Sequence, residues 1–293
     1  MNIYHAIWEA DMESNGIRPI FPTDKGEESD GYVVVNTEAS SCEDPIFKKV
    51  QIPERKRHSY QLVEKLFDNY SLNQTKREEN TKDESTEVEE FLRMAVDTLP
   101  IKTAKDFIEE KTETVFTGLQ WFHYLHDLWF HQFDWESGKD LSGFEHIFIG
   151  DQKRRKMVGH HFWYKYWLED NANLNKHRKD QLELTFNNHV INSASPYVMT
   201  IGYRLKAFDN DKKRFMNLHK KKCAFFVGIS AEGLMALGTV RALAHKDVPE
   251  YIVFDSLCYT LELFKSPDGM RIRTFYPIIQ GDPKSLTFGH PIF

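Results

Sequence analysis

The order of periodic patterns along this 293-residue chain constrains its fold most strongly. Apolar residues recur at helical spacing in much of the first half, most clearly in residues 86–99 and 115–133. From residue 251 the pattern changes to short strands, predicted at residues 251–254, 259–264, 270–279 and 286–293. Helices followed by an antiparallel meander predict an α+β fold, with a helical N-terminal half and antiparallel sheets after it.

The domain prediction divides the chain near residue 54. Residues 1–54 are expected to form a small β-rich arm, because Asn15-Gly16 signals a turn and residues 31–35 (GYVVV) a strand. Residues 55–293 are expected to form one larger domain. Within it, a capping box at Thr86–Glu89 predicts a helix that Pro100 closes, and residues 182–203 predict only short strands and turns.

Composition excludes several classes of protein. The net charge is −6, so a general electrostatic grip on nucleic acid is not expected, and a polyanion would have to be held by local cationic clusters. Three cysteines without a CxxC pair predict neither a disulfide framework nor structural zinc. The absence of a secretory signal and of an 18-residue apolar run predicts a cytoplasmic protein without a membrane partner. Export by a non-classical route stays open.

Residues 142–170 carry the densest chemistry. Residues 144–149 alternate and then become apolar, which predicts a half-buried strand that contains His146. His160 and His161 lie near the start of a predicted aromatic helix, and the four cations of residues 153–156 join the two elements. Two histidines beside a cationic turn indicate acid–base chemistry on a phosphate. The alternative is a pair of structural histidines and a solvated turn.

The motifs of this chain resemble those of one known family, the EndoU or XendoU-like endoribonucleases. They share their catalytic domain with the coronavirus uridylate-specific endoribonuclease. The resemblance covers roughly residues 55–293. It rests on SGFEHIFIGD (142–151), VGHHFW (158–163), Lys220 with FVGISAE (226–232), LFDNY (66–70) and the helical pattern of residues 87–100. It implies an EndoU-like catalytic fold for this larger domain.

The resemblance implies cleavage of single-stranded RNA by attack of a ribose 2′-hydroxyl on the adjacent phosphate, with a preference for uridylates. The products would be a 2′,3′-cyclic phosphate and a 5′-hydroxyl. By resemblance, His161 is the base, His146 the acid and Lys220 the cation that stabilises the phosphorane. The two histidine roles are interchangeable on sequence grounds. Neighbouring residues offer register alternatives: His160 for His161, and Lys221 or Lys222 for Lys220.

Further residues are assigned supporting or binding roles by the same resemblance. Glu145 and Asp151 match acidic family positions, where they would orient histidines or a metal. Ala224 replaces a serine that the family associates with uracil selection. In place of the family's Thr-x-Tyr motif, Phe288 and His290 are the predicted match, while Thr274-Phe275-Tyr276 is set aside as one strand too early. The remaining predicted substrate contacts are Trp163, Arg154 and Arg155.

No cofactor is required for this chemistry and no metal site is predicted, although Mn²⁺ is a candidate activator. The expected partners are single-stranded RNA and, if the protein acts as a toxin rather than in RNA processing, an inhibitor protein; no DNA partner is expected. Two alternatives remain beside the active enzyme. One is an RNA-binding relative with little or no cleavage, suggested by the altered serine and tyrosine positions. The other is an interaction protein with structural histidines.

Overall fold

The N-terminal segment begins with a helix that the sequence did not predict. The computed structural model describes residues 2–39, 44–171, 183–192, 195–209 and 212–280. Helix α1 (Ile3–Glu13) is capped by Asn2 and buries Ile7 and Trp8. It contacts α4 and α7 of the main body, so this segment shares the central core. The expected β-structure follows in a sheet of β1 (Arg18–Ile20), β2 (Tyr32–Val35) and β3 (Phe47–Gln51). The domain boundary at residue 54 stays a prediction.

The helical first half is confirmed, although two of its boundaries were wrong. It comprises the 3₁₀ turns Glu54–Lys56 and Leu66–Asp68 and the helices α2 (Arg57–Lys65), α3 (Lys82–Ala95), α4 (Leu99–Thr112) and α5 (Gly118–Phe130). The capping box of α3 is formed by Thr81 and Glu84, five residues earlier than predicted. Pro100 does not close a helix but lies in the first turn of α4, where its missing N–H has no intrahelical partner to lose.

Three further sheets follow the helices. Hairpin β4 (Phe133–Trp135) and β5 (Gly138–Leu141) comes first. A five-stranded sheet then has the spatial order β6 (Asp151–Lys153), β7 (Lys156–Val158), β10 (Arg214–Phe226), β9 (Val198–Asp209) and β8 (Glu183–Asn192). Strands β8 and β9 have 10 and 12 residues, whereas only short strands and turns were predicted for residues 182–203. The last sheet is the antiparallel meander β11 (Tyr251–Phe254), β12 (Leu257–Lys265) and β13 (Ile272–Ile279). The strand predicted at 286–293 lies outside the described residues.

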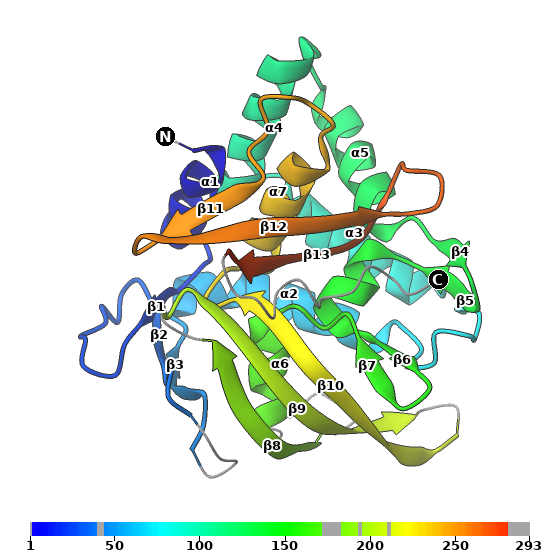
Figure 1. The fold of residues 1–293 in the computed structure, drawn as a ribbon. Coiled ribbons are helices and arrows are strands. Elements are labelled where there is room, and N and C mark those ends of the chain that lie inside the picture. The colour runs from blue at the N-terminus through cyan, green and yellow to red at the C-terminus, as the bar shows by residue number, and fades with distance from the viewer. Residues whose placement is uncertain (1, 40–43, 172–182, 193–194, 210–211, 281–293) are drawn as a thin grey trace.

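Helix α7 (Ala231–Ala242) lies at the centre of the molecule. Its predicted cap is confirmed, since the Ser230 side chain accepts a hydrogen bond from Gly233 N. The helix is buried along almost its whole length and contacts α1, α4, β12 and β13. Figure 1 shows it behind the β11–β13 sheet, with α4 and α5 above and the five-stranded sheet below. The α+β class is therefore confirmed, with the helices, the five-stranded sheet and the β11–β13 sheet packed around one core.

Candidate functional site

His146 lies on a π-helix rather than on the predicted strand. The π-helix spans Glu145–Ile149 and ends at Gly150, whose φ is +86°. Phe144 and Phe148 stack with ring centroids 4.5 Å apart, so this short segment buries a helical face. Periodicity over so few residues does not separate a buried strand from a buried helix, which explains the wrong prediction. Single π-turns are frequent at functional sites.

The second histidine motif packs directly on this π-helix. His160 N donates to His146 O at 2.8 Å, and His161 N donates to Ile147 O at 2.6 Å. Gly159 adopts a φ of +68°, and a Cβ there would lie only 1.8 Å from His146 O. Glycine is thus required at position 159, because no side chain fits between the two motifs. The approach of the two backbones brings His146 and His161 to one cleft.

Lys220 joins the histidines from strand β10. The pairing of β10 with β9 is irregular between Lys220 and Cys223, which changes the register at this point of the strand. The Lys220 ammonium donates to the carbonyl oxygen of Gly159 and faces the same cleft. Its burial lowers the pKa of the Lys220 ammonium. The structure therefore brings His146, His161 and Lys220 together from three separate elements.

The two histidines expose equivalent ring nitrogens but have different partners. Nδ1 of His161 lies 2.8 Å from the carbonyl oxygen of Ala224, and Nδ1 of His146 lies 2.6 Å from Oδ2 of Asp151. A carbonyl oxygen can only accept a hydrogen bond, as can an ionised carboxylate, so Nδ1 carries the proton in both rings. Each neutral ring is left with an unprotonated Nε2. A carboxylate partner stabilises an imidazolium more than a carbonyl does.

The carboxyl groups beside His146 differ in charge. Burial disfavours ionisation of Asp151, but its hydrogen bond with His146 and the charge of Arg273 outweigh that effect and hold its pKa below the usual range. The Arg273 Nη2 lies 3.5 Å from Asp151 Oδ2. Burial, with the negative charge of Asp151, raises the pKa of Glu145 well above its usual range. Asp151 is therefore ionised at neutral pH, and Glu145 is the carboxyl group of the pair that favours the protonated form.

Burial also acts on both histidines. It lowers the pKa of His146 to about 4, with a further lowering by Arg273 and an opposite effect of Asp151. Burial and the charge of Lys220 hold the pKa of His161 well below its ordinary value of 6.5. Both imidazoles are consequently neutral at pH 7 in the free protein. A bound phosphate anion acts in the opposite direction and favours the charged form.

His160 has contacts that separate it from the cleft. It is fully buried, with Nδ1 bonded to the Tyr203 hydroxyl and Nε2 lying 2.9 Å from Glu169 Oε2. Lys165, also fully buried, pairs with the same Glu169. This polar cluster lies beneath the site, which favours His161 over its neighbour as the residue that meets a substrate.

Two predicted substrate contacts are buried. Trp163 has no exposed surface and donates its indole N–H to Ile229 O at 2.7 Å. Ala224 is 1% exposed, and the contact that it makes with the site is the one from its carbonyl oxygen to His161. Neither side chain lines the cleft, so their predicted roles would have to be indirect.

The cleft has a volume of about 690 Å³ and a strongly cationic lining. None of its lining residues in the described part of the chain is acidic, whereas six are lysine or arginine: Lys153, Lys156, Lys220, Lys221, Lys222 and Arg273. Arg154 and Arg155, predicted to bind substrate, lie in the turn between β6 and β7 and are not among these residues. The strand residues on either side of the turn, Lys153 and Lys156, face the cleft instead.

Thr274 and Tyr276 on β13, which the sequence prediction set aside, lie at the site. Both line the cleft, and the Tyr276 ring stacks on His161 with centroids 4.6 Å apart and an interplanar angle of 13°. Their spacing of two along a strand, which places both on one face, was the signal that could have found them. Phe288 and His290, preferred in their place, lie outside the described residues, so their role stays a prediction.

Comparison with known proteins identifies the family. A family model described as "Endoribonuclease XendoU" matches residues 2–277. The chain belongs to the XendoU endoribonuclease family. It is accordingly an enzyme of the endoribonuclease class, as the sequence predicted.

Individual members of the XendoU family match most of the chain. The chain is 27% identical to "Uridylate-specific endoribonuclease C" of Danio rerio, covering 94% of this chain and 86% of that protein. It is 26% identical to "Poly(U)-specific endoribonuclease-A" of Xenopus laevis, covering 94% and 92%. A solved structure titled "The structure of XendoU: a splicing independent snoRNA processing endoribonuclease" superposes with a TM-score of 0.66 at 20% identity. That match covers 94% of this chain and 95% of the other, and it supports the fold.

The carboxyl groups of the site do not fit a divalent metal. Among the described residues, no group of three His, Cys, Asp or Glu side chains is placed to hold an ion. Asp151 already contacts His146 and a guanidinium, and burial favours the protonated form of Glu145. A hard cation needs several ionised oxygen ligands, which this pair does not supply. None of the helices in the described ranges has the length and apolarity that crossing a bilayer would need.

Proposed function

We propose that this XendoU-family enzyme cleaves single-stranded RNA by transesterification, leaving 2′,3′-cyclic phosphate and 5′-hydroxyl ends. One observation carries the proposal: His146 and His161 face the same cationic cleft, each with Nδ1 occupied and Nε2 available. Cleavage by a 2′-hydroxyl needs one group that accepts its proton and another that protonates the leaving 5′-oxygen. Two imidazoles serve both needs near neutral pH.

The partners of the two rings support the roles expected from the sequence. His161 is neutral in the free protein, and its Nε2 accepts the proton of the 2′-hydroxyl. His146 lies beside Asp151, whose charge stabilises the imidazolium, so it donates the proton to the leaving oxygen. The phosphate of the bound RNA raises the pKa of His146 and loads it with that proton. Lys220 stabilises the negative charge that gathers on the phosphorane.

A preference for uridylates is part of the proposal. Relatives from Danio rerio and Xenopus laevis are named for uridylate or poly(U) cleavage. Tyr276 offers an aromatic face beside His161 on which a base or ribose packs. The side chain of Ala224 does not line the cleft, so the uridine preference is proposed without a contact from position 224. A cytoplasmic location and an inhibitor partner stay predictions from the sequence.

The test is cleavage of an RNA oligonucleotide that contains all four bases, in EDTA and in Mn²⁺, with mass analysis of the ends. Cyclic-phosphate ends in EDTA are expected, with most cuts after uridine. His146→Ala should abolish cleavage. The control is His123→Ala, because His123 lies on α5 and outside this cleft. Equal cleavage by parent and His146→Ala would refute the mechanism. Tight binding without cleavage in either buffer would favour the RNA-binding alternative.

A further inference from the structure

One side of the cleft carries residues that the proposed chemistry does not use. Trp135, at the end of β4, is half-buried and lines the cleft. Lys156 of β7 and His219 of β10 line it as well, and they are direct register partners in the parallel pairing of those strands. An aromatic ring and two basic side chains thus lie beyond the two catalytic histidines.

One ion pair and two strand pairings connect the residue after Trp135 to Lys156 and His219. Glu136, the next residue, pairs with Lys153 at 2.8 Å. Lys153 lies opposite Lys156 in the pairing of strands β6 and β7. Lys156 in turn lies opposite His219 in the pairing of β7 and β10. The contacts therefore run without a break from the tryptophan to the two basic residues.

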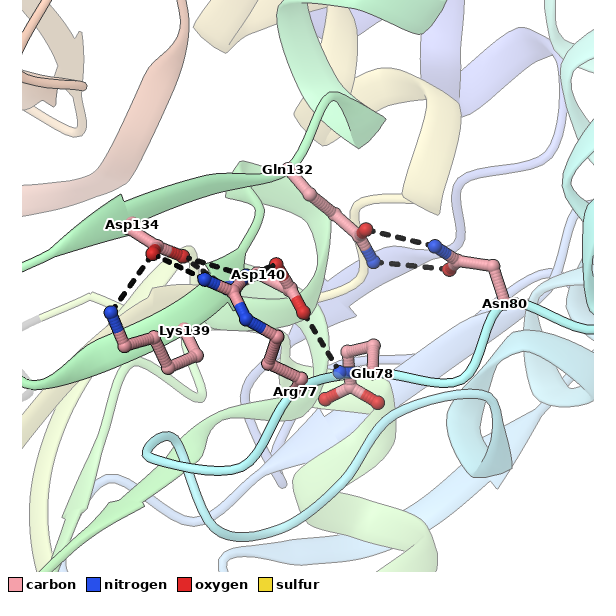
Figure 2. A network of polar contacts seen from close by, with 7 residues as sticks. All are labelled: Arg77, Glu78, Asn80, Gln132, Asp134, Lys139 and Asp140. Carbon is pink, nitrogen blue, oxygen red and sulfur yellow. Dashed lines mark hydrogen bonds and ion pairs between the residues drawn. The ribbon is translucent and has the colours of Figure 1, made fainter.

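The hairpin that carries Trp135 is anchored from its other side. Figure 2 shows Arg77 between Asp134 and Asp140, with Lys139 also on Asp134. Arg77 contacts Asp134 with both terminal nitrogens, at 2.8 and 3.3 Å. Isolated surface pairs contribute little, but a bidentate arginine within a network restrains the backbone that it joins.

A second pair of bonds anchors the start of the hairpin. The side-chain amides of Asn80 and Gln132 exchange hydrogen bonds of 2.9 and 3.1 Å, also drawn in Figure 2. Backbone N–H groups add to them, since Lys139 N donates to Gln74 O and Glu78 N to Asp140. The indole is consequently presented to the cleft by a braced turn.

The chemistry of this side matches a nucleotide. No stacked ring partner is found for Trp135 within the described residues, and its ring has surface in the cleft. Single-stranded nucleic acid is bound by aromatic faces that stack bases, together with basic groups that follow the phosphates. The cationic lining supplies the second component within a chain whose net charge is −6.

We propose that Trp135 stacks on a base beyond the two nucleotides that the cleaved linkage joins, while Lys156 and His219 hold the phosphate next to that base. This inference rests on the proposed function, and it names a nucleotide subsite separate from the one at Tyr276. The enzyme would therefore recognise RNA longer than a dinucleotide. Because stacking tolerates any base, the subsite adds affinity without adding sequence preference.

The test measures binding without cleavage, so that it does not depend on the catalytic proposal. A fully 2′-O-methylated uridine hexamer lacks the attacking hydroxyl, and its affinity is read by fluorescence anisotropy beside that of the matching dinucleotide. Loss of one base–aromatic stack weakens binding roughly five- to 150-fold, and this is the loss expected for Trp135→Ala with the hexamer. Dinucleotide binding should be unchanged, and Trp135→Phe should retain most of the hexamer affinity.

Controls separate a lost stack from a damaged hairpin. Tyr251→Ala removes an exposed aromatic residue that does not line the cleft and should bind as the parent does. Lys156→Gln should reduce the slope of log affinity against log salt by about 0.7, the share of one phosphate contact on a single strand. If Trp135→Ala unfolds, quenching of indole fluorescence by the hexamer should occur in the parent and be reduced in Trp135→Phe.

The outcomes distinguish the two proposals. Equal weakening of hexamer and dinucleotide, no weakening of either, or no hexamer binding by the parent would overturn the subsite. Hexamer binding that depends on Trp135, in a parent protein that leaves unmodified RNA intact, would support the subsite and refute the proposed cleavage. Normal cleavage by the parent together with unchanged hexamer affinity in Trp135→Ala would support the proposed cleavage and refute the subsite.

Discussion

Replacing Asp151 by Asn removes a buried negative charge from between two groups that depend on it. Asp151 is fully buried, its Oδ2 lying 2.6 Å from His146 Nδ1 and 3.5 Å from Arg273 Nη2. Arg273 is only 8% exposed, so the change would leave a buried guanidinium without its counter-charge. The neighbouring Glu145→Gln provides the matched control, since burial favours the neutral form of Glu145 and an amide of the same size replaces it.

The two substitutions should differ sharply in stability. Breaking a buried ion pair on one side costs about 3–5 kcal/mol. At about 2.1 cal/mol/K per residue, 293 residues have an unfolding entropy near 0.6 kcal/mol/K, so Asp151→Asn should lower Tm by roughly 5–8 °C. Glu145→Gln replaces a carboxyl group that favours its neutral form by a neutral amide and should change the free energy of unfolding by less than about 1 kcal/mol.

Calorimetry and RNA cleavage assays at pH 7 test this charge assignment together. Asp151→Asn should also reduce kcat by roughly 10²–10⁴, because the acid His146 loses the group that orients and charges it. A result in which Glu145→Gln is the more destabilising of the two would refute the reasoning, since it would place the ionised carboxylate on Glu145. Equal and small effects would show that neither group carries the charge.

Three further changes test other parts of the structure. Tyr276→Ala should lower kcat/KM by roughly 5- to 100-fold through loss of stacking beside His161, with Tyr276→Phe nearly active, as read by steady-state kinetics. Gly159→Ala should cost more than about 2 kcal/mol in urea unfolding, because φ is +68° and the new Cβ meets His146 O; normal stability there would contradict the packing. Burial raises the pKa of Asp11 to about 7, so the folded state holds a proton that the unfolded state releases above 3.8. The free energy of unfolding should therefore fall by about 4 kcal/mol as the pH rises from 3.8 to about 7. Asp11→Asn should remove most of this dependence when unfolding is measured at both ends of that pH range.

Much of the fold was readable from local patterns, but boundaries and two elements were not. The Ser230 cap, the strand Tyr251–Phe254 and the antiparallel meander follow from spacing and turn chemistry, which act within a few residues. The π-helix around His146 was predicted as a strand, because a stretch of six residues with four apolar positions suits either element. Helix α1 was missed in a segment dominated by turn and strand signals, and its burial against α4 and α7 stabilises it.

The sequence by itself determined which chemistry the chain carries: two histidine motifs, a lysine and a cationic turn, in an order that resembles one family. Tertiary structure decided how they are used. Packing beneath the site buries His160 and leaves His161 in the cleft, although the two are adjacent in sequence. Arg273 reaches Asp151, and Tyr276 reaches His161, over more than a hundred residues. Spacing along the chain fixes only which residues share an element, whereas the faces that meet across elements depend on burial of the whole core.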